Sequence, residues 1–391
     1  MKLGIICGYP IPYGMAATTR IFSYSKGLAE CGDNVDVCSV ITTDHSLDIE
    51  NEGVFNHVSF FYSYRCKKAS NKFLHMLELI YSLLISGYKL YKRGKNEKYD
   101  IFIISSDSIC KLLYMRLTNL FFKCKLIFIF DEYPIPIRKN CKEKIPKWKK
   151  LAYKVVLNQY SGYISISNNL LSYYQNINNK PGIVIPSITD ISRFKNICTK
   201  RRDNNTHYNI VYMGNMELSK DNVDNIIHAF AILLLKGYDA SLNLYGRPNT
   251  RDKQKLDKII KDEHLDSKVS FSYATYDMVP QILSDADILV SSQPMTVRAD
   301  GGFPTKLGEY LMSGTPTLLT DVGETSTYFK NKTHLYFAKP ESPKDFADKL
   351  VYIINNYDEA LLTAKNGKEY VISTYSHSSA GKKIHEFLEQ L

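Results

Sequence analysis

The sequence lacks the features that mark a secreted, membrane-spanning or zinc-binding chain. Its eight cysteines are scattered without any Cys-x-x-Cys spacing, so we predict neither disulfides nor a zinc site. The apolar run 3–7 is too short for a signal peptide, and we expect the protein to stay in the cytoplasm. The stretch Phe73 to Tyr88 is broken by polar residues and a glycine, short of the roughly 20 apolar residues of a bilayer span.

Acidic residues are scarce in the first half of the chain. Residues 1–200 hold 28 Lys and Arg against 15 Asp and Glu, whereas residues 201–391 hold 22 against 25. The segment Arg138 to Lys154 is rich in lysine and holds the single tryptophan, Trp148. It suits either an anionic membrane surface or a solvated helical face. We expect a peripheral protein at the inner face of the cell membrane, and no nucleic-acid binding because no interleaved aromatic platform is present.

The length of 391 residues, 44% of them hydrophobic, predicts two folded domains. Each half opens with a β-rich run, a glycine turn and a helical pattern, first from Lys2 and again from Asn209. This succession of strand, glycine turn and helix is typical of a doubly wound α/β unit. We place the boundary near residue 196, where the sequence turns polar, giving domains 1–196 and 197–374. The tail 375–391 forms a helix that packs back on the first domain.

Continuous Ile, Val, Leu and Phe runs, separated by segments of helical length, predict parallel sheets covered on both faces. Ligands bind at the carboxyl ends of strands in such sheets, so we expect the two domains to face each other across a cleft lined by their loops. The predicted strands are 2–7, 34–40, 101–105, 125–130, 162–165, 183–185, 209–213, 241–245, 269–271, 288–291, 317–320 and 334–337.

The segment 298–324 predicts a phosphate-binding loop and helix. Gly301 and Gly302 indicate a glycine loop, and Pro304 opens a helix over 305–312 that ends at Gly314. Amides near Gly302 and Phe303 are expected to approach an anion, and Lys306 adds a charge on the first turn. Glu309, one turn further, suits the two hydroxyls of a ribose. An amphipathic helix with a solvated Lys and Glu explains the same spacing.

This segment resembles the donor-binding signature of family 4 retaining glycosyltransferases of the GT-B fold, with matches at Gly302, Phe303, Glu309, Gly314 and Pro316. The likeness extends over about 300 residues. Further ordered matches lie in the runs 10–20, 163–168, 185–194 and 285–292. The resemblance implies a nucleotide diphosphate sugar donor, retention of anomeric configuration, and no metal or other cofactor.

Two departures from the family pattern concern the donor. The first Glu of the family pair falls on Gly301, with Asp300 one residue earlier as a substitute. The family's Arg after the first strand of the second domain is Asn215, whereas the following Lys keeps its place as Lys220. Lys306 or Arg298 would then restore the missing charge on the diphosphate.

Other candidates stand at predicted strand ends. Asp131 and Glu132 follow the strand 125–130 and are expected to contact the reacting sugars; a loop cap is the alternative. Gly14 would let the backbone approach the donor, or simply form a turn. Arg247 and Tyr273 lie where the family places the nucleotide and its base, though a surface charge and core packing explain them equally.

The sequence therefore predicts a GT-B glycosyltransferase of the hexosyltransferase type. It would move a sugar from a donor, UDP- or GDP-linked, to a hydroxyl of a lipid-diphosphate-linked glycan in capsule, O-antigen or other surface polysaccharide assembly. A nucleotide-sugar epimerase and a non-catalytic nucleotide-binding regulator of the same fold are the alternatives.

Overall fold

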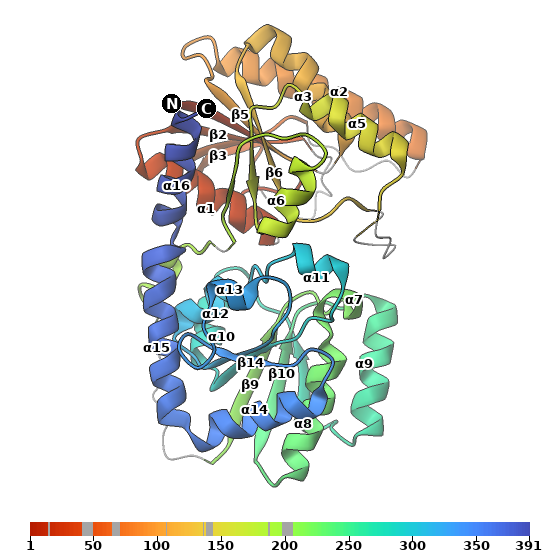
Figure 1. Cartoon of the computed structure of the whole chain (residues 1–391), viewed down its shortest axis with the longest axis vertical. Coiled ribbons are helices and arrows are strands. Elements are labelled where there is room, and N and C mark those ends of the chain that lie inside the picture. Colours follow the sequence, from red (N-terminus) through yellow and green to blue (C-terminus); the bar gives the residue numbers. More distant parts are fainter. Residues whose placement is uncertain are drawn as a thin grey trace. The chain divides into compact units, whose positions relative to one another are not determined.

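The computed structural model describes residues 1–14, 16–40, 50–64, 71–106, 108–135, 137, 144–186, 188–197 and 206–391. These residues form two compact units (Figure 1). The first unit holds Met1–Ile188 with His377–Leu391, and the second holds Thr189–Ser376. The first unit thus ends before the expected boundary at 196, because the Thr189 amide donates to the Tyr375 carbonyl at 3.0 Å and joins the second unit. Residues 198–205 of the expected linker and 138–143 of the basic segment lie outside the described residues.

The first unit is an eight-stranded sheet in the order β3-β4-β2-β1-β5-β6-β7-β8 with helices on its faces (Figure 1). Its buried strands carry Ile, Val and Phe on both faces, as parallel strands between helical layers do. Its elements are β1 (Lys2–Cys7), α1 (Ala16–Glu30), β2 (Asn34–Ser39), β3 (Glu52–Phe55), β4 (Val58–Tyr62), α2 (Lys72–Arg93), β5 (Ile101–Ser105), α3 (Ile109–Phe122), β6 (Lys125–Phe130), α5 (Lys147–Leu157), β7 (Gly162–Ser165), α6 (Asn168–Gln175), β8 (Gly182–Val184) and α16 (His377–Glu389).

The second unit is a six-stranded parallel sheet in the order β11-β10-β9-β12-β13-β14. This is the 3-2-1-4-5-6 order of the Rossmann fold, whose switch point lies between its first and fourth strands. Its elements are η1 (Ile191–Phe194), β9 (Tyr208–Met213), α7 (Leu218–Asp221), α8 (Val223–Leu235), β10 (Ala240–Tyr245), α9 (Thr250–Asp262), β11 (Val269–Ser272), α10 (Val279–Asp285), β12 (Ile288–Ser291), α11 (Val297–Gly301), α12 (Leu307–Ser313), β13 (Thr317–Thr320), α13 (Thr325–Tyr328), β14 (Tyr336–Ala338), α14 (Pro343–Asn355) and α15 (Tyr357–Thr374).

The prediction of two Rossmann-like α/β units is confirmed, with one departure from all-parallel pairing. β3 and β4 pair antiparallel through a two-residue turn, and neither strand was predicted. Asn56 and His57 form that turn with φ of 50° and 64°, values that a tight hairpin turn requires and that glycine usually supplies. The sequence signal for a hairpin was weak because no glycine marks the turn.

The last helix, α16, packs on α1 of the first unit at two glycines. A Cβ on Gly27 would lie 2.9 Å from the Cα of Gly381, so the two helices approach as closely as small residues permit. His385 Nδ1 lies 2.7 Å from Asp33 Oδ2, and His377 Nε2 lies 2.9 Å from Glu30 Oε1. These polar contacts fix the register of α16 against the end of α1.

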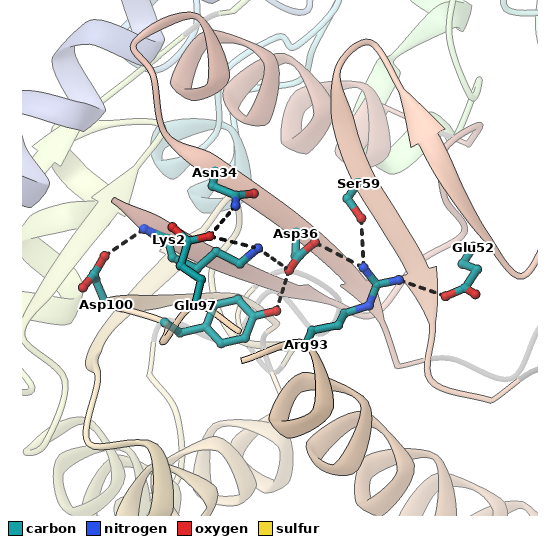
Figure 2. Close-up of polar contacts among 9 residues, drawn as sticks. Lys2, Asn34, Asp36, Glu52, Ser59, Arg93, Glu97 and Asp100 are labelled. Atoms are coloured by element: carbon teal, nitrogen blue, oxygen red, sulfur yellow. Dashed lines mark hydrogen bonds and ion pairs between the residues drawn. The ribbon is translucent and has the colours of Figure 1, made fainter. Parts of the chain in front are cut away.

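A buried carboxylate ties the end of α2 to the sheet of the first unit. Asp36 of β2, 2% exposed, accepts from Tyr99 OH at 2.6 Å and pairs with Lys2 Nζ at 3.0 Å. Arg93, the last residue of α2, reaches the same carboxylate at 3.5 Å and also pairs with Glu52 of β3 at 2.8 Å (Figure 2). Burial of these charges is tolerated because each has a partner.

Within the described ranges, no helix combines the length and the apolar character needed to cross a membrane.

Candidate functional site

Two glycines bring the carboxyl ends of β9 and β10 together. A Cβ on Gly246 would lie 1.8 Å from the Gly214 carbonyl oxygen, and Gly246 has a φ of 151°, a conformation that side-chain-bearing residues avoid. A Cβ on Gly214 would lie 2.6 Å from the Lys306 Nζ. The lack of a side chain at Gly214 therefore lets the Lys306 ammonium reach the end of β9.

Lys306 belongs to a buried ion pair at this strand end. Its Nζ donates to Asp221 Oδ1 at 3.0 Å and to Tyr212 OH at 3.2 Å, with the two charged side chains 18% and 5% exposed. Burial lowers the pKa of Lys306, and Asp221 opposes this change. Burial would raise the pKa of Asp221, but Lys306 and then Lys220 hold it below its usual value. Lys306 is therefore already paired with Asp221, whereas the sequence suggested an unpaired cation.

Glu309 on α12 is paired with an arginine that the sequence analysis did not single out. Arg193 of η1 donates from Nη1 to Glu309 Oε1 and from Nη2 to the Tyr276 carbonyl oxygen, the latter at 2.6 Å. The Arg193 guanidinium also lies 3.7 Å from the centroid of the Tyr276 ring. The Glu309 side chain remains 23% exposed, so the arginine orients the carboxylate without enclosing it.

The prediction of a glycine loop at 301–302 is wrong, because Gly301 is the last residue of the helix α11. Thr296 caps this helix by accepting from the Ala299 amide at 3.3 Å. The Gly302 amide donates to the Ala299 carbonyl at 3.0 Å, so that amide closes the turn instead of facing an anion. Asp300 is exposed on α11. The helix α12 begins at Leu307, two residues later than expected.

Phe303 and Pro304 link α11 to α12 and are both buried. The Phe303 ring, 5% exposed, packs against Tyr328 and Phe329 with centroid distances of 5.9 and 6.2 Å. The Pro304 carbonyl accepts from the Leu307 amide at 2.9 Å and starts α12. Their side chains thus set the position of α12, and with it that of Glu309.

The loop after β9 carries the position where the family's arginine is replaced. Asn215 is exposed, and Lys220 lies half-buried on α7. Glu217 of this loop accepts from Arg298 Nη1 of α11 at 3.1 Å. The structure therefore brings Asn215, Lys220 and Arg298 to one strand end, with Lys306 beneath them.

Arg247 and Tyr273 form a stacked pair at the ends of the two neighbouring strands, β10 and β11. The Arg247 guanidinium lies 3.9 Å from the Tyr273 ring centroid. Both residues are exposed, Tyr273 at 56%. A cation resting on an aromatic face offers a flat surface on which a nucleobase can stack.

In the first unit, Asp131 directly follows β6 and meets an arginine of α1. Arg20 Nε lies 3.4 Å from Asp131 Oδ1, and Arg20 Nη2 donates to the Ile185 carbonyl at 2.8 Å. Arg20 is 4% exposed, whereas the Asp131 side chain is 27% exposed. The strand ends of this unit therefore present a carboxylate to solvent, supported from behind by a buried cation.

Glu132 and Gly14 were predicted to join Asp131. Glu132 is half-buried, next to Asp131 in the chain. Gly14 is exposed, and a Cβ there would lie 3.0 Å from the Pro10 carbonyl oxygen. Thr18 at the start of α1 donates to that same oxygen at 2.7 Å, which explains a glycine at this turn without a ligand.

Sequence reasoning missed Asp221, Arg193 and Arg20 as contributors to these strand ends. Asp221 follows Lys220 directly, and a carboxylate beside a predicted phosphate-binding lysine was a usable signal. Arg193 lay within the matched run 185–194 and Arg20 within 10–20. Nothing in the local spacing of either arginine showed which carboxylate it would meet.

Two Rossmann-like units in one chain, with the last helix returned to the first unit, define the GT-B class of α/β protein. The chain belongs to the family described as glycosyl transferases group 1, whose model matches residues 194–389. A curated relative, the poly(ribitol-phosphate) alpha-N-acetylglucosaminyltransferase of Staphylococcus aureus (strain COL), is 23% identical over 201 residues. That match covers 51% of this chain and 39% of the relative, so the chain spans well under half of that protein.

Solved structures show the same fold over the whole chain. TarM superposes with a TM-score of 0.74 at 14% identity, covering 99% of this chain and 98% of its own. A sucrose-phosphate synthase from Thermosynechococcus elongatus gives 0.72 at 14%, covering 100% and 98%. Anabaena HepE in complex with UDP and glucose also gives 0.72 at 14%, covering both chains fully.

Proposed function

We propose that this chain is a retaining glycosyltransferase that transfers a sugar from a UDP- or GDP-sugar to a hydroxyl of a glycan acceptor. The observation that carries the proposal is that Lys220 and Lys306 lie beside Asp221 past the carboxyl end of β9, with Glu309 in the first turn of the helix that follows Lys306. This is the edge at which Rossmann sheets bind their ligands. Membership of the group 1 family supports the reaction class.

The donor would lie with its diphosphate toward the lysines. Lys220 and Lys306 would neutralise the charge that develops on the leaving diphosphate. Glu309, held by Arg193, would accept hydrogen bonds from the ribose hydroxyls. The Arg247–Tyr273 pair would stack on the base. UDP in the HepE structure favours uridine as the base to test first.

The acceptor would react near Asp131, a partly exposed carboxylate at the strand ends of the first unit. Arg20 lies 3.4 Å behind its Oδ1 and would hold the carboxylate in place to orient an acceptor hydroxyl. We propose a lipid-diphosphate-linked glycan in surface polysaccharide assembly as the acceptor. The relative from S. aureus acts, by its name, on poly(ribitol-phosphate), so a polyol-phosphate polymer belongs in the same acceptor screen.

A thermal-shift screen with UDP, GDP and ADP and their sugars tests the donor site, because a ligand that binds only the folded protein raises its melting temperature. Lys220→Ala and Glu309→Gln should abolish the shift. Matched controls are Lys236→Ala and Glu263→Gln, whose side chains form exposed pairs with Asp348 and His228 in the same unit. If the first two variants respond like wild type, the donor lies elsewhere.

Turnover is tested separately by nucleotide release with and without an acceptor. Release that requires the acceptor supports transfer, and the anomeric configuration of the product, read by nuclear magnetic resonance, tests retention. Interconversion of nucleotide sugars without an acceptor would instead support an epimerase. Binding without turnover on any acceptor would support a regulator.

A further inference from the structure

Helix α2 exposes most of its large apolar side chains, and its packing side combines two serines with Leu83 and Leu90. Ser82 and Ser86 are 0% exposed, and Ser82 Oγ lies 2.5 Å from Ser63 Oγ. At Gly87 a Cβ would lie 2.5 Å from Tyr114 OH of α3, so small residues form part of the packing side. In contrast, Leu84 is 61% exposed. An amphipathic helix on a water-facing surface usually has charged and polar residues on its outer face instead.

Exposed apolar side chains follow helical spacing along α2, α3 and α5. Of the 28 large apolar side chains exposed in the described residues, 16 lie on these three helices. Helix α3 contacts both α2 and α5, and the three run over one side of the first unit (Figure 1). The 16 residues are Phe73, Leu74, Met76, Leu77, Ile80, Tyr81, Leu84, Tyr88, Tyr91, Leu113, Leu117, Leu120, Phe121, Trp148, Leu151 and Val155. We name this set the three-helix face.

The helices that form the three-helix face are strongly basic. Their sequences contain ten Lys and Arg and a single acidic residue, Glu78. Helix α5 alone carries Lys147, Lys149, Lys150 and Lys154. Lys147 and Lys150 are exposed on either side of Trp148, which is itself 69% exposed. Apolar stripes with aromatic residues and lysines together are the composition of a helix that lies in a lipid headgroup region.

Helix α2 is held to the sheet by charge. Arg93 at its end is anchored by Asp36, Ser59 and Glu52 (Figure 2). The Lys89 ammonium donates to the Tyr62 carbonyl at 2.7 Å. Because the helix is fixed by these contacts and by its serine side, its apolar side chains are free to meet another surface.

We propose that the three-helix face docks the protein on an anionic phospholipid bilayer. The excess of lysine and arginine complements anionic headgroups, whereas a second copy of the chain would bring the same positive charge against itself. An array of three apolar stripes is also larger than the scattered apolar residues normal on a soluble surface. The proposal does not depend on the proposed reaction, since it concerns binding without nucleotide or acceptor.

The single tryptophan makes the test direct. Trp148 fluorescence is followed as vesicles of equal parts phosphatidylcholine and phosphatidylglycerol, with brominated phosphatidylcholine chains, are added to the full chain. We expect a blue shift and quenching by the bromines, and co-flotation of the protein with the vesicles. Vesicles of phosphatidylcholine alone should bind about tenfold less, because each lysine near an anionic surface contributes to binding.

Two paired variants separate the apolar and the electrostatic parts. Leu117→Ser with Leu120→Ser, and Lys147→Ala with Lys150→Ala, should each weaken vesicle binding on the order of tenfold. The controls are Leu361→Ser with Leu362→Ser on α15 and Lys255→Ala with Lys258→Ala on α9, where the original residues are also exposed. These controls should bind like wild type. Each variant is used only after its melting temperature matches that of the parent chain.

Three results would overturn the proposal. The first is no flotation and no bromine quenching with anionic vesicles. The second is equal loss in the controls and in the variants of the three-helix face. The third is a Trp148 blue shift that depends on protein concentration without lipid, together with a dimer mass in light scattering, which would assign the face to a second copy of the chain.

Discussion

Each unit contains a buried aspartate paired with a lysine, and the two pairs lie at opposite ends of their sheets. Asp36 lies toward the amino ends of β1 and β2, where Lys2, Tyr99 and Arg93 surround it. Asp221 lies past the carboxyl end of β9, where Lys306 remains 18% exposed. Ligands of parallel sheets bind at carboxyl ends. Similar chemistry therefore serves structure in the first unit and, in the second, leaves a partly exposed cation at the edge where we propose that the donor binds.

The two units also differ in the apolar side chains and the charge on their surfaces. Among the residues that the structure describes, the second unit exposes eight large apolar side chains, whereas the first exposes 20, most of them on the three-helix face. Residues 189–376, which form the second unit, also hold 24 Asp and Glu against 23 Lys and Arg. Two units of the same fold therefore differ in their surfaces, and only the first carries the face that we propose docks on lipid.

Breaking the pair of the second unit should have the largest effect. Lys306→Met leaves Asp221 buried without its partner, which should cost about 3–5 kcal/mol in the free energy of unfolding. Adding Asp221→Asn should restore much of this stability but not nucleotide binding. Urea unfolding and UDP titration of both variants make the comparison. Wild-type UDP affinity in the double variant would show that Lys306 serves structure alone.

Breaking the pair of the first unit should lower stability without touching the nucleotide. Asp36→Ala leaves Lys2, Tyr99 and Arg93 without their shared acceptor, a loss of about 3 kcal/mol. Glu97→Ala, a 52% exposed partner of Lys2, is the matched control and should cost less than about 1 kcal/mol. Unfolding curves and UDP titration are compared. A fall in UDP affinity in Asp36→Ala would contradict the separation of the two roles.

A smaller effect is expected from removing the arginine that orients Glu309. Arg193→Ala should weaken UDP binding about tenfold, comparable to one hydrogen bond with a charged partner. Isothermal titration calorimetry measures the UDP dissociation constant of the variant, and Arg251→Ala, at an exposed position of α9, is the control. Tighter binding in Arg193→Ala would mean that the arginine competes with the ribose instead of preparing its carboxylate.

The sequence predicted the sheets well because buried parallel strands are continuous apolar runs, such as Ile101–Ser105 and Lys125–Phe130. It failed at α11, where Gly301 and Gly302 suggested a loop although Thr296 supplies a helix cap. Thr296 is a typical N-cap residue, but the two adjacent glycines favoured the prediction of a loop. Local propensity decides little when a five-residue helix is stabilised by its surroundings.

For the candidate sites, the strand-end residues could be placed from sequence and their partners could not. Lys306 and Glu309 were expected to offer free charges, yet each meets a residue far along the chain, Asp221 and Arg193. Such pairings depend on how loops from different strands converge. The apolar stretch Phe73 to Tyr88 was visible in the sequence, but only the structure shows that most of its large side chains face outward.

The smallest expected effect is a pH dependence of the stability that α16 gains from its contact with the residues after α1. A hydrogen bond to Asp33 raises the pKa of His385, although burial opposes it and the nearby amino terminus lowers it. A raised pKa means that this contact stabilises fully below pH of about 6.5 and is lost as pH rises through the folded value. Asp33 also holds the Met1 ammonium at 2.8 Å, and Glu389 lies 3.3 Å from His385 Nε2. These groups keep the local charge nearly balanced, so the contribution should stay below about 1 kcal/mol.

Between pH 6 and 8 the melting temperature of His385→Gln should therefore fall less than that of the parent chain, with exposed His228→Gln following the parent. Parallel curves for all three proteins would show that the His385–Asp33 contact does not contribute to stability in this pH range.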